Sequence, residues 1–117
     1  MPSVLRADIQ QRVTRQGGRL SGVVTVRNTG DTLWLRGTGH GHVLLGIQLF
    51  TAGRALLDRD FVRVTLPTDV ASDQSVEVAI GITLPDATTP YILKLDLVDE
   101  GVCWFEDVGS RPVYVSV

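Results

Sequence analysis

The sequence contains little of several features that would narrow its function. Cys103 is the only cysteine, which excludes an intramolecular disulfide and a zinc site built from several cysteines. The longest apolar stretch, residues 43–50, is interrupted by Gly46 and Gln48 and is far shorter than the ~20 residues that span a bilayer. The chain has no excess of basic residues, because it contains eleven Lys and Arg and thirteen Asp and Glu, which gives a net charge of −2. We therefore expect no membrane and no nucleic-acid partner.

The length and composition are those of an ordinary globular protein. With 117 residues, 44% of them hydrophobic and 21% charged, the chain is long enough for one core, so we expect one domain spanning residues 1–117. The first residues show no cationic start followed by an apolar run, and a lone cysteine fits a reducing compartment. These features favour a soluble, cytoplasmic protein.

Alternation of apolar and polar residues with a period of two runs through nearly the whole chain, and helical spacing is almost absent. The alternation is cleanest from Val76 to Leu84, and segments rich in glycine, proline and asparagine separate the apolar runs. This pattern predicts an all-β, immunoglobulin-like β-sandwich of about seven to nine antiparallel strands. We expect strands at residues 5–9, 20–27, 32–35, 43–50, 76–84, 91–97 and 113–117. Residues 54–66 alternate less cleanly and predict one or two exposed strands, and a short strand carrying Trp104 follows the acidic glycine turn after residue 97.

Four segments of the sequence carry a resemblance to a known family: NTGDTLWL, GIQLF, DRDFVRVTLPTDV and YILKLDLVDEGVCWFEDVGSRPV. Together they resemble a bacterial immunoglobulin-like accessory domain found at the end of glycosyltransferases and methyltransferases of surface-polysaccharide synthesis. They are more distantly similar to the four-tryptophan immunoglobulin-like module of autophagy receptors. The resemblance covers about residues 20–117 and implies a β-sandwich with a non-catalytic role.

The two tryptophans, Trp34 and Trp104, are the candidates for a ligand or partner surface. An exposed indole stacks on the apolar face of a sugar ring while nearby carboxylates bond its hydroxyls. Trp104 has four such neighbours in sequence, namely Asp99, Glu100, Glu106 and Asp107. The favoured interpretation is that both indoles plug the sandwich core, as large aromatic side chains usually do. A glycosidase pair among these carboxylates is disfavoured, because tight turns rarely form a deep cleft.

The glycine-rich segment from Arg36 to Gly41 is a loop rather than a phosphate-binding motif, because no helix follows it. His40 and His42 have the spacing of two ligands on one strand face, but no third ligand is evident, so we expect no metal. Cys103 has no histidine beside it in sequence to activate it, and we expect an inert thiol. We also expect no cofactor.

We expect a non-catalytic accessory or binding module that is attached to, or acts with, an enzyme of glycan or cell-surface biosynthesis. It would recognise carbohydrate or position the partner catalytic domain. The alternative is a protein–protein or homodimerisation module that pairs through sheet edges, favoured if the apolar residues of 43–49 are partly exposed. Those residues are Val43, Leu45, Ile47 and Leu49. An enzyme is least favoured, because no set of nucleophile, base and orienting group can be assembled.

Overall fold

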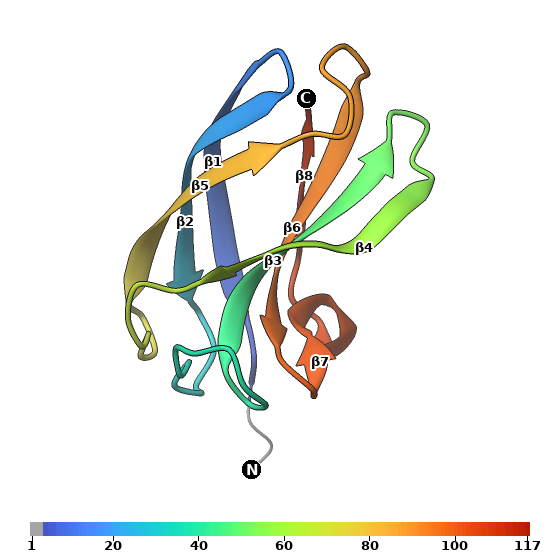
Figure 1. The fold of residues 1–117 in the computed structure, drawn as a ribbon. Helices are drawn as coiled ribbons and strands as arrows, with labels where there is room; N and C mark the ends of the chain where they lie inside the picture. The colour runs from blue at the N-terminus through green and yellow to red at the C-terminus, as the bar shows by residue number, and fades with distance from the viewer. Residues whose placement is uncertain (1–3) are drawn as a thin grey trace.

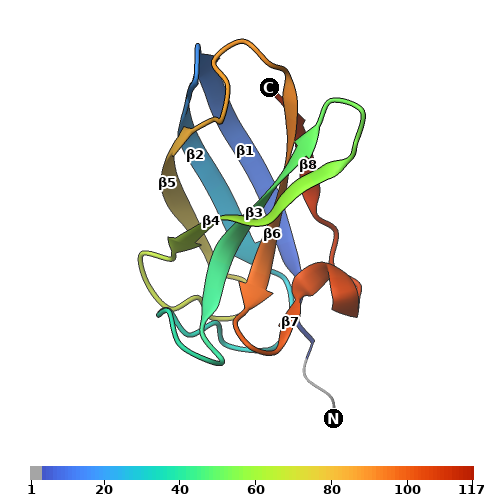
Figure 2. The same ribbon diagram turned by 45° about the vertical axis from the view of Figure 1, so that its right-hand side comes forward.

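The computed structural model describes residues 4–117 and consists of two antiparallel sheets packed face to face (Figures 1 and 2). The smaller sheet has three strands in the order β1-β2-β5, with β1 at Ala7–Gln16, β2 at Arg19–Asn28 and β5 at Ser75–Thr83. The tight β1–β2 hairpin turns at Gly17, whose φ of 57° favours glycine. The predicted immunoglobulin-like β-sandwich is confirmed.

The larger sheet has five strands, with β3 at its centre. β3 (Val43–Thr51) pairs with β4 (Leu56–Thr65) on one side and with β6 (Tyr91–Asp99) on the other. The short strands β7 (Cys103–Trp104) and β8 (Val113–Ser116) both pair with the remaining edge of β6, at opposite ends of it. The 3-10 helix η1 (Phe105–Val108) follows β7 and lies at the end of this sheet (Figure 1).

Alternating side chains of both sheets form the core between the layers. The inward residues of β2, such as Val24, face those of β6, such as Leu95, while the polar residues between them point outward. The other largest buried side chains are Leu20, Val26, Trp34, Leu45, Ile47, Leu49, Leu66, Leu93, Leu97 and Phe105.

The buried Asn28 fixes the segment that carries Trp34. Its Nδ2 donates hydrogen bonds to the carbonyl oxygens of Thr32 and Val70 (2.7 and 3.0 Å), and its Oδ1 accepts one from the Gly30 N–H (3.1 Å). The Trp34 ring packs edge-on against Phe105, with ring centroids 5.4 Å apart. Since a buried amide with these partners holds the backbone in one path, Trp34 is locked into the core.

Two expectations for local structure were wrong or incomplete. Residues 32–35 do not form a strand, because Trp34 makes only an isolated bridge to Val70 while the Asn28 amide occupies the Thr32 carbonyl. Residues 54–66, where one or two strands were expected, contain one long edge strand, β4. Within residues 4–117, no helix has the length and apolar character needed to cross a membrane.

Candidate functional site

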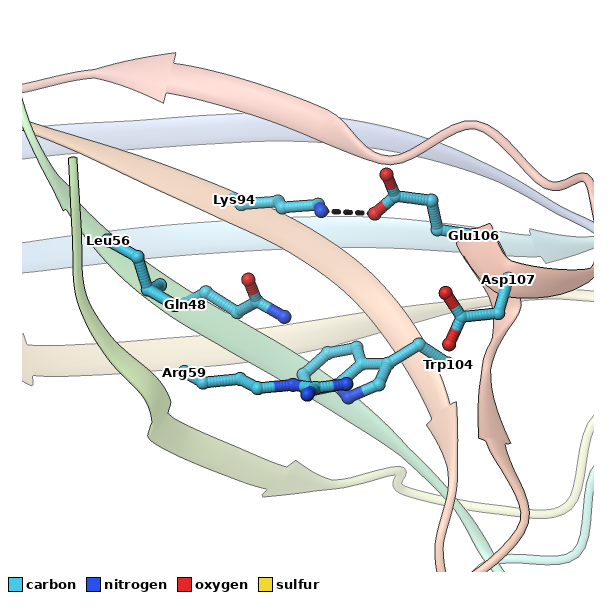
Figure 3. Close-up of a pocket in the computed structure, with 7 residues that line it drawn as sticks. All are labelled: Gln48, Leu56, Arg59, Lys94, Trp104, Glu106 and Asp107. Carbon is cyan, nitrogen blue, oxygen red and sulfur yellow. Dashed lines mark ion pairs between the residues drawn. The ribbon is translucent and has the colours of Figure 1, made fainter. Parts of the chain in front are cut away.

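A hollow of about 260 Å³ opens on the outer face of the five-stranded sheet, away from the core (Figure 3). Side chains from β3, β4, β6, β7 and η1 reach into it, so residues far apart in the sequence meet there. Its lining consists of Gln48, Leu56, Arg59, Lys94, Trp104, Glu106 and Asp107.

Strand alternation explains why polar side chains gather on this outer face. Within the otherwise apolar β3, Gln48 lies between two core residues and therefore points outward, and Lys94 does the same in β6. The register of the two strands sets Gln48 directly opposite Lys94. Both side chains are largely shielded, and only 12% of the Lys94 side chain is exposed.

Trp104 forms one wall of the hollow. It lies on the outer face of the sheet above Gly46, where the absence of a side chain leaves room for the indole. The guanidinium carbon of Arg63 lies 4.6 Å from the indole centroid, a cation–π contact. Arg63 is itself held by two carboxylates, since its Nε donates to Glu100 (2.8 Å) and its Nη2 to Asp60 (2.7 Å). The indole is therefore fixed between a backbone surface and a clamped arginine.

Lys94 and Glu106 form an ion pair across the hollow (Figure 3). Burial disfavours the Lys94 ammonium, but the hydrogen bond and the negative charge of Glu106 outweigh this effect, so the pKa of Lys94 is raised. The lysine is thus a permanent cation that offers its remaining N–H donors to a ligand. The carboxylates of Glu106 and Asp107 on η1 offer hydrogen-bond acceptors, and the Gln48 amide offers a donor and an acceptor.

Asp96 lies beneath this arrangement and ties η1 to the sheet. It is fully buried on the outer face of β6, and its two carboxylate oxygens accept hydrogen bonds from the Leu97 N–H and the Glu106 N–H, both at 2.9 Å. Burial raises the pKa of Asp96 to about 6, although these two hydrogen bonds act in the opposite direction. The buried Asp96 carboxylate therefore anchors the helix that presents Glu106 and Asp107, although its burial disfavours its charged form.

The two tryptophans have different environments, and only one supports the favoured interpretation. Trp34 is 0% exposed inside the core, so the prediction that it is a core plug is confirmed and it offers no ligand surface. Trp104 is buried too, at 8% exposed, but it packs with Leu44 and Val98 on the outer face rather than between the sheets. The prediction of a core plug is wrong for Trp104, because β7 pairs with the free edge of β6 and the indole packs on Gly46 at the outer face of the sheet.

The remaining candidate residues lie at the end of the sandwich beside the hollow. His40 and His42 are in the β2–β3 loop, not on a strand face, and the Gly41 N–H donates to the Glu100 carbonyl oxygen (2.9 Å). The His40 ring lies against Gly101, and burial raises the pKa of Asp99. Neither histidine reaches the hollow. No cluster of three or more metal-ligating side chains occurs in the part of the chain described, residues 4–117.

Cys103 is half-buried next to the hollow. Burial raises the pKa of its thiol, and the negative charges of Asp99, Asp107 and Asp96 raise it further. Since the thiolate is the reactive form, a raised pKa favours the unreactive thiol.

Sequence reasoning found Trp104, Glu106 and Asp107 because they are neighbours along the chain. It missed Gln48, Leu56, Arg59 and Lys94, which come from distant strands. One signal was present in the sequence: Gln48 is the one polar side chain in the longest apolar stretch, residues 43–50. The pairing register that brings Gln48 opposite Lys94 could not be predicted from the sequence.

Comparison with family models gives no match, and neither does comparison with curated proteins. Two solved structures of β-glucosidase 3B from Thermotoga neapolitana, in complex with glucose and with α-D-glucose, share the fold with TM-scores of 0.50 and 0.52 at 12% and 11% identity. They cover 97% and 98% of this chain, which spans only 16% of theirs. A β-glucosidase from Kluyveromyces marxianus in complex with glucose superposes with a TM-score of 0.46 at 9% identity over 96% of this chain and 15% of its own. The likeness to the two Thermotoga neapolitana structures shows a shared fold alone.

Proposed function

We propose that this chain is a non-catalytic carbohydrate-binding module that serves an enzyme of glycan or cell-surface biosynthesis. The observation that carries the proposal is the convergence of an amide, a guanidinium, an ammonium and two carboxylates beside one indole in a single open hollow. Such a mixture of donors and acceptors on a fixed scaffold suits the many hydroxyls of a sugar.

Two other hollows, of about 130 and 270 Å³, support the proposal by contrast. The smaller lies on the three-stranded sheet around Gln10 and Thr25, and the larger lies around Arg6 and Ser110. Neither is lined by an aromatic side chain, whereas the Trp104 indole, covered on its faces by Gly46 and Arg63, lines the first hollow and gives it an apolar contact for a sugar. The resemblance of the sequence to accessory domains of polysaccharide-synthesis enzymes also favours a glycan as the ligand.

The test is a glycan array followed by isothermal titration calorimetry on the best saccharides, with Gln48→Ala as the site variant. Gln48 presents its amide in the hollow without pairing to another side chain there, so its loss removes hydrogen bonds to a ligand. We expect about a tenfold loss of affinity or more, since one lost hydrogen bond costs about 1.5 kcal/mol.

The matched control is Gln10→Ala, the same change on the exposed face of the opposite sheet. It should bind like the wild type. Absence of saccharide binding by the wild-type chain, or equal losses in both variants, would refute a carbohydrate site in this hollow.

A homodimer that pairs through sheet edges is the second candidate, but not through the residues first considered. Val43, Leu45, Ile47 and Leu49 are all buried in the core, so the exposure that would make them favour association is not present. The observation that favours a dimer is the β4 edge, which pairs only with β3 within residues 4–117 and exposes Leu56 and Leu57 at 51% and 53%.

The charges of β4 fit pairing with a second copy. A two-fold axis between residues 59 and 60 would set Arg59 of each strand opposite Asp60 of the other. Sedimentation equilibrium over a hundredfold concentration range tests this, with Leu57→Lys as the variant expected to dissociate the dimer. A wild-type chain that stays monomeric over this range would rule it out.

A further inference from the structure

An exposed aromatic ring lies on the same face of the sheet as the hollow. The pairing registers form a row across three strands, in which Gln48 of β3 is opposite Lys94 of β6, and Lys94 is opposite Tyr114 of β8. Residues in register point to the same face, so Tyr114 shares the outer face with the hollow. Tyr114 is 48% exposed, far more than Trp104, and it does not line the hollow itself.

The Tyr114 ring is held in place by its neighbours. Phe50 packs edge-on against it, with centroids 6.4 Å apart and planes at 62°. The Arg54 guanidinium carbon and the Lys94 Nζ lie 5.8 and 5.7 Å from its centroid. An aromatic ring fixed by such contacts loses little conformational freedom when a ligand stacks on it.

Lys94 connects this ring to the hollow. Its ammonium pairs with Glu106 on the hollow side and lies near the Tyr114 ring on the other. From β3 to β8 the row crosses two strand spacings, about 10 Å in all, which is more than one sugar ring covers. A ligand that used both places would therefore contain more than one sugar residue.

We propose that Tyr114 is a second subsite of the same binding surface and that the ligand is an oligosaccharide of at least two residues. One residue occupies the hollow beside Trp104, and a neighbouring residue stacks its apolar face on Tyr114. Arg54 and Lys94 donate hydrogen bonds to the hydroxyls of the stacked residue. This inference rests on the proposed function, and it adds the length of the ligand and the residue that sets it.

The test compares short and longer ligands on the same protein. The probes are D-glucose, D-galactose, D-mannose and L-rhamnose and their homodisaccharides and homotrisaccharides, titrated by calorimetry. For at least one of these sugars we expect the wild-type chain to bind the longer probe tenfold or more tightly than the monosaccharide. Tyr114→Ala should abolish this gain in affinity with ligand length. Tyr114→Phe, which keeps the ring and its stacking face, should retain the gain.

The outcomes separate the two proposals. If Tyr114→Ala binds the longer probes as the wild type does, or if length brings no gain, the second subsite is refuted while the hollow stands. If no saccharide binds to the wild-type chain, the subsite and the proposed function are refuted together. Circular dichroism and melting temperature check that the Ala variant is folded, as expected for a half-exposed side chain.

Discussion

The Trp104 indole lies directly above Gly46, so close that a Cβ at residue 46 would be 2.5 Å from the ring atom Cζ3. Gly46 is placed there by β3 and Trp104 by β7, two strands that do not pair with each other. The glycine therefore determines where the wall of the hollow stands. Any side chain at residue 46 must displace the indole or the strand.

Gly46→Ala should destabilise the protein and move Trp104. Overpacking of this kind costs about 1–3 kcal/mol, which denaturant unfolding followed by circular dichroism measures. Gly53→Ala is the control, because a Cβ there would meet only the Thr51 Oγ1 at 3.7 Å. If both variants unfolded at the same denaturant concentration as the wild type, the close approach of Trp104 to Gly46 would be wrong.

Arg63→Lys should uncover Trp104. Lysine keeps the charge but loses the planar group that contacts the indole and pairs with both Glu100 and Asp60, so the indole gains access to solvent. We expect stronger acrylamide quenching of tryptophan fluorescence, which reports on Trp104 because Trp34 is fully buried, and a loss of stability of about 1 kcal/mol.

Arg12→Lys provides the control for this arginine. Its contact with Glu77 is long, at 3.8 Å, and both side chains are largely exposed, so the change should alter neither quenching nor stability. Unchanged quenching in Arg63→Lys would show that the arginine does not cover the indole.

Asp96 should make the free energy of unfolding fall as the pH rises. Because its pKa rises from 3.8 in the unfolded chain to about 6 in the folded protein, the folded state holds the proton more tightly between these values. Its contribution to stability is therefore complete below pH 3.8 and is lost as pH rises through 6, by about 2–3 kcal/mol. Asp96→Asn, which cannot ionise, should lack this loss.

The measurement is the difference in unfolding free energy between wild type and Asp96→Asn at pH 4 and pH 7. The Asn variant loses one of the two backbone hydrogen bonds at both values, so only the change with pH reports on ionisation. A difference that stays constant between pH 4 and pH 7 would contradict the raised pKa of Asp96.

The sequence predicted the sandwich because alternation with a period of two is clear in several of the long strands, such as β5, although it is absent from β4. It also predicted a short strand carrying Trp104, which is β7. It could not predict where the indole lies, because that depends on the space above Gly46 and on contacts with β6. Residues 32–35 were misassigned as a strand for a related reason: a buried amide, Asn28, replaces strand pairing there.

The candidate site was predicted in part. The segment from Trp104 to Asp107 is continuous in the sequence and was recognised, whereas Lys94 and Tyr114 became part of the surface only through strand register. Register between distant strands follows from packing of the whole core, which alternation alone does not specify. Asp99, Glu100 and the two histidines were grouped with the site by proximity in sequence or by residue type, but they lie at the end of the sandwich.

The central claim is that carbohydrate binds on the outer face of the five-stranded sheet, and an NMR titration tests it most directly. Spectra of the ¹⁵N-labelled chain are recorded as the oligosaccharide that binds best on the array is added. We predict shifts at the amides of Gln48, Lys94 and Glu106 and at the indole N–H of Trp104, with none in β1, β2 or β5. Shifts confined to the β2–β3 loop or to the three-stranded sheet would contradict it.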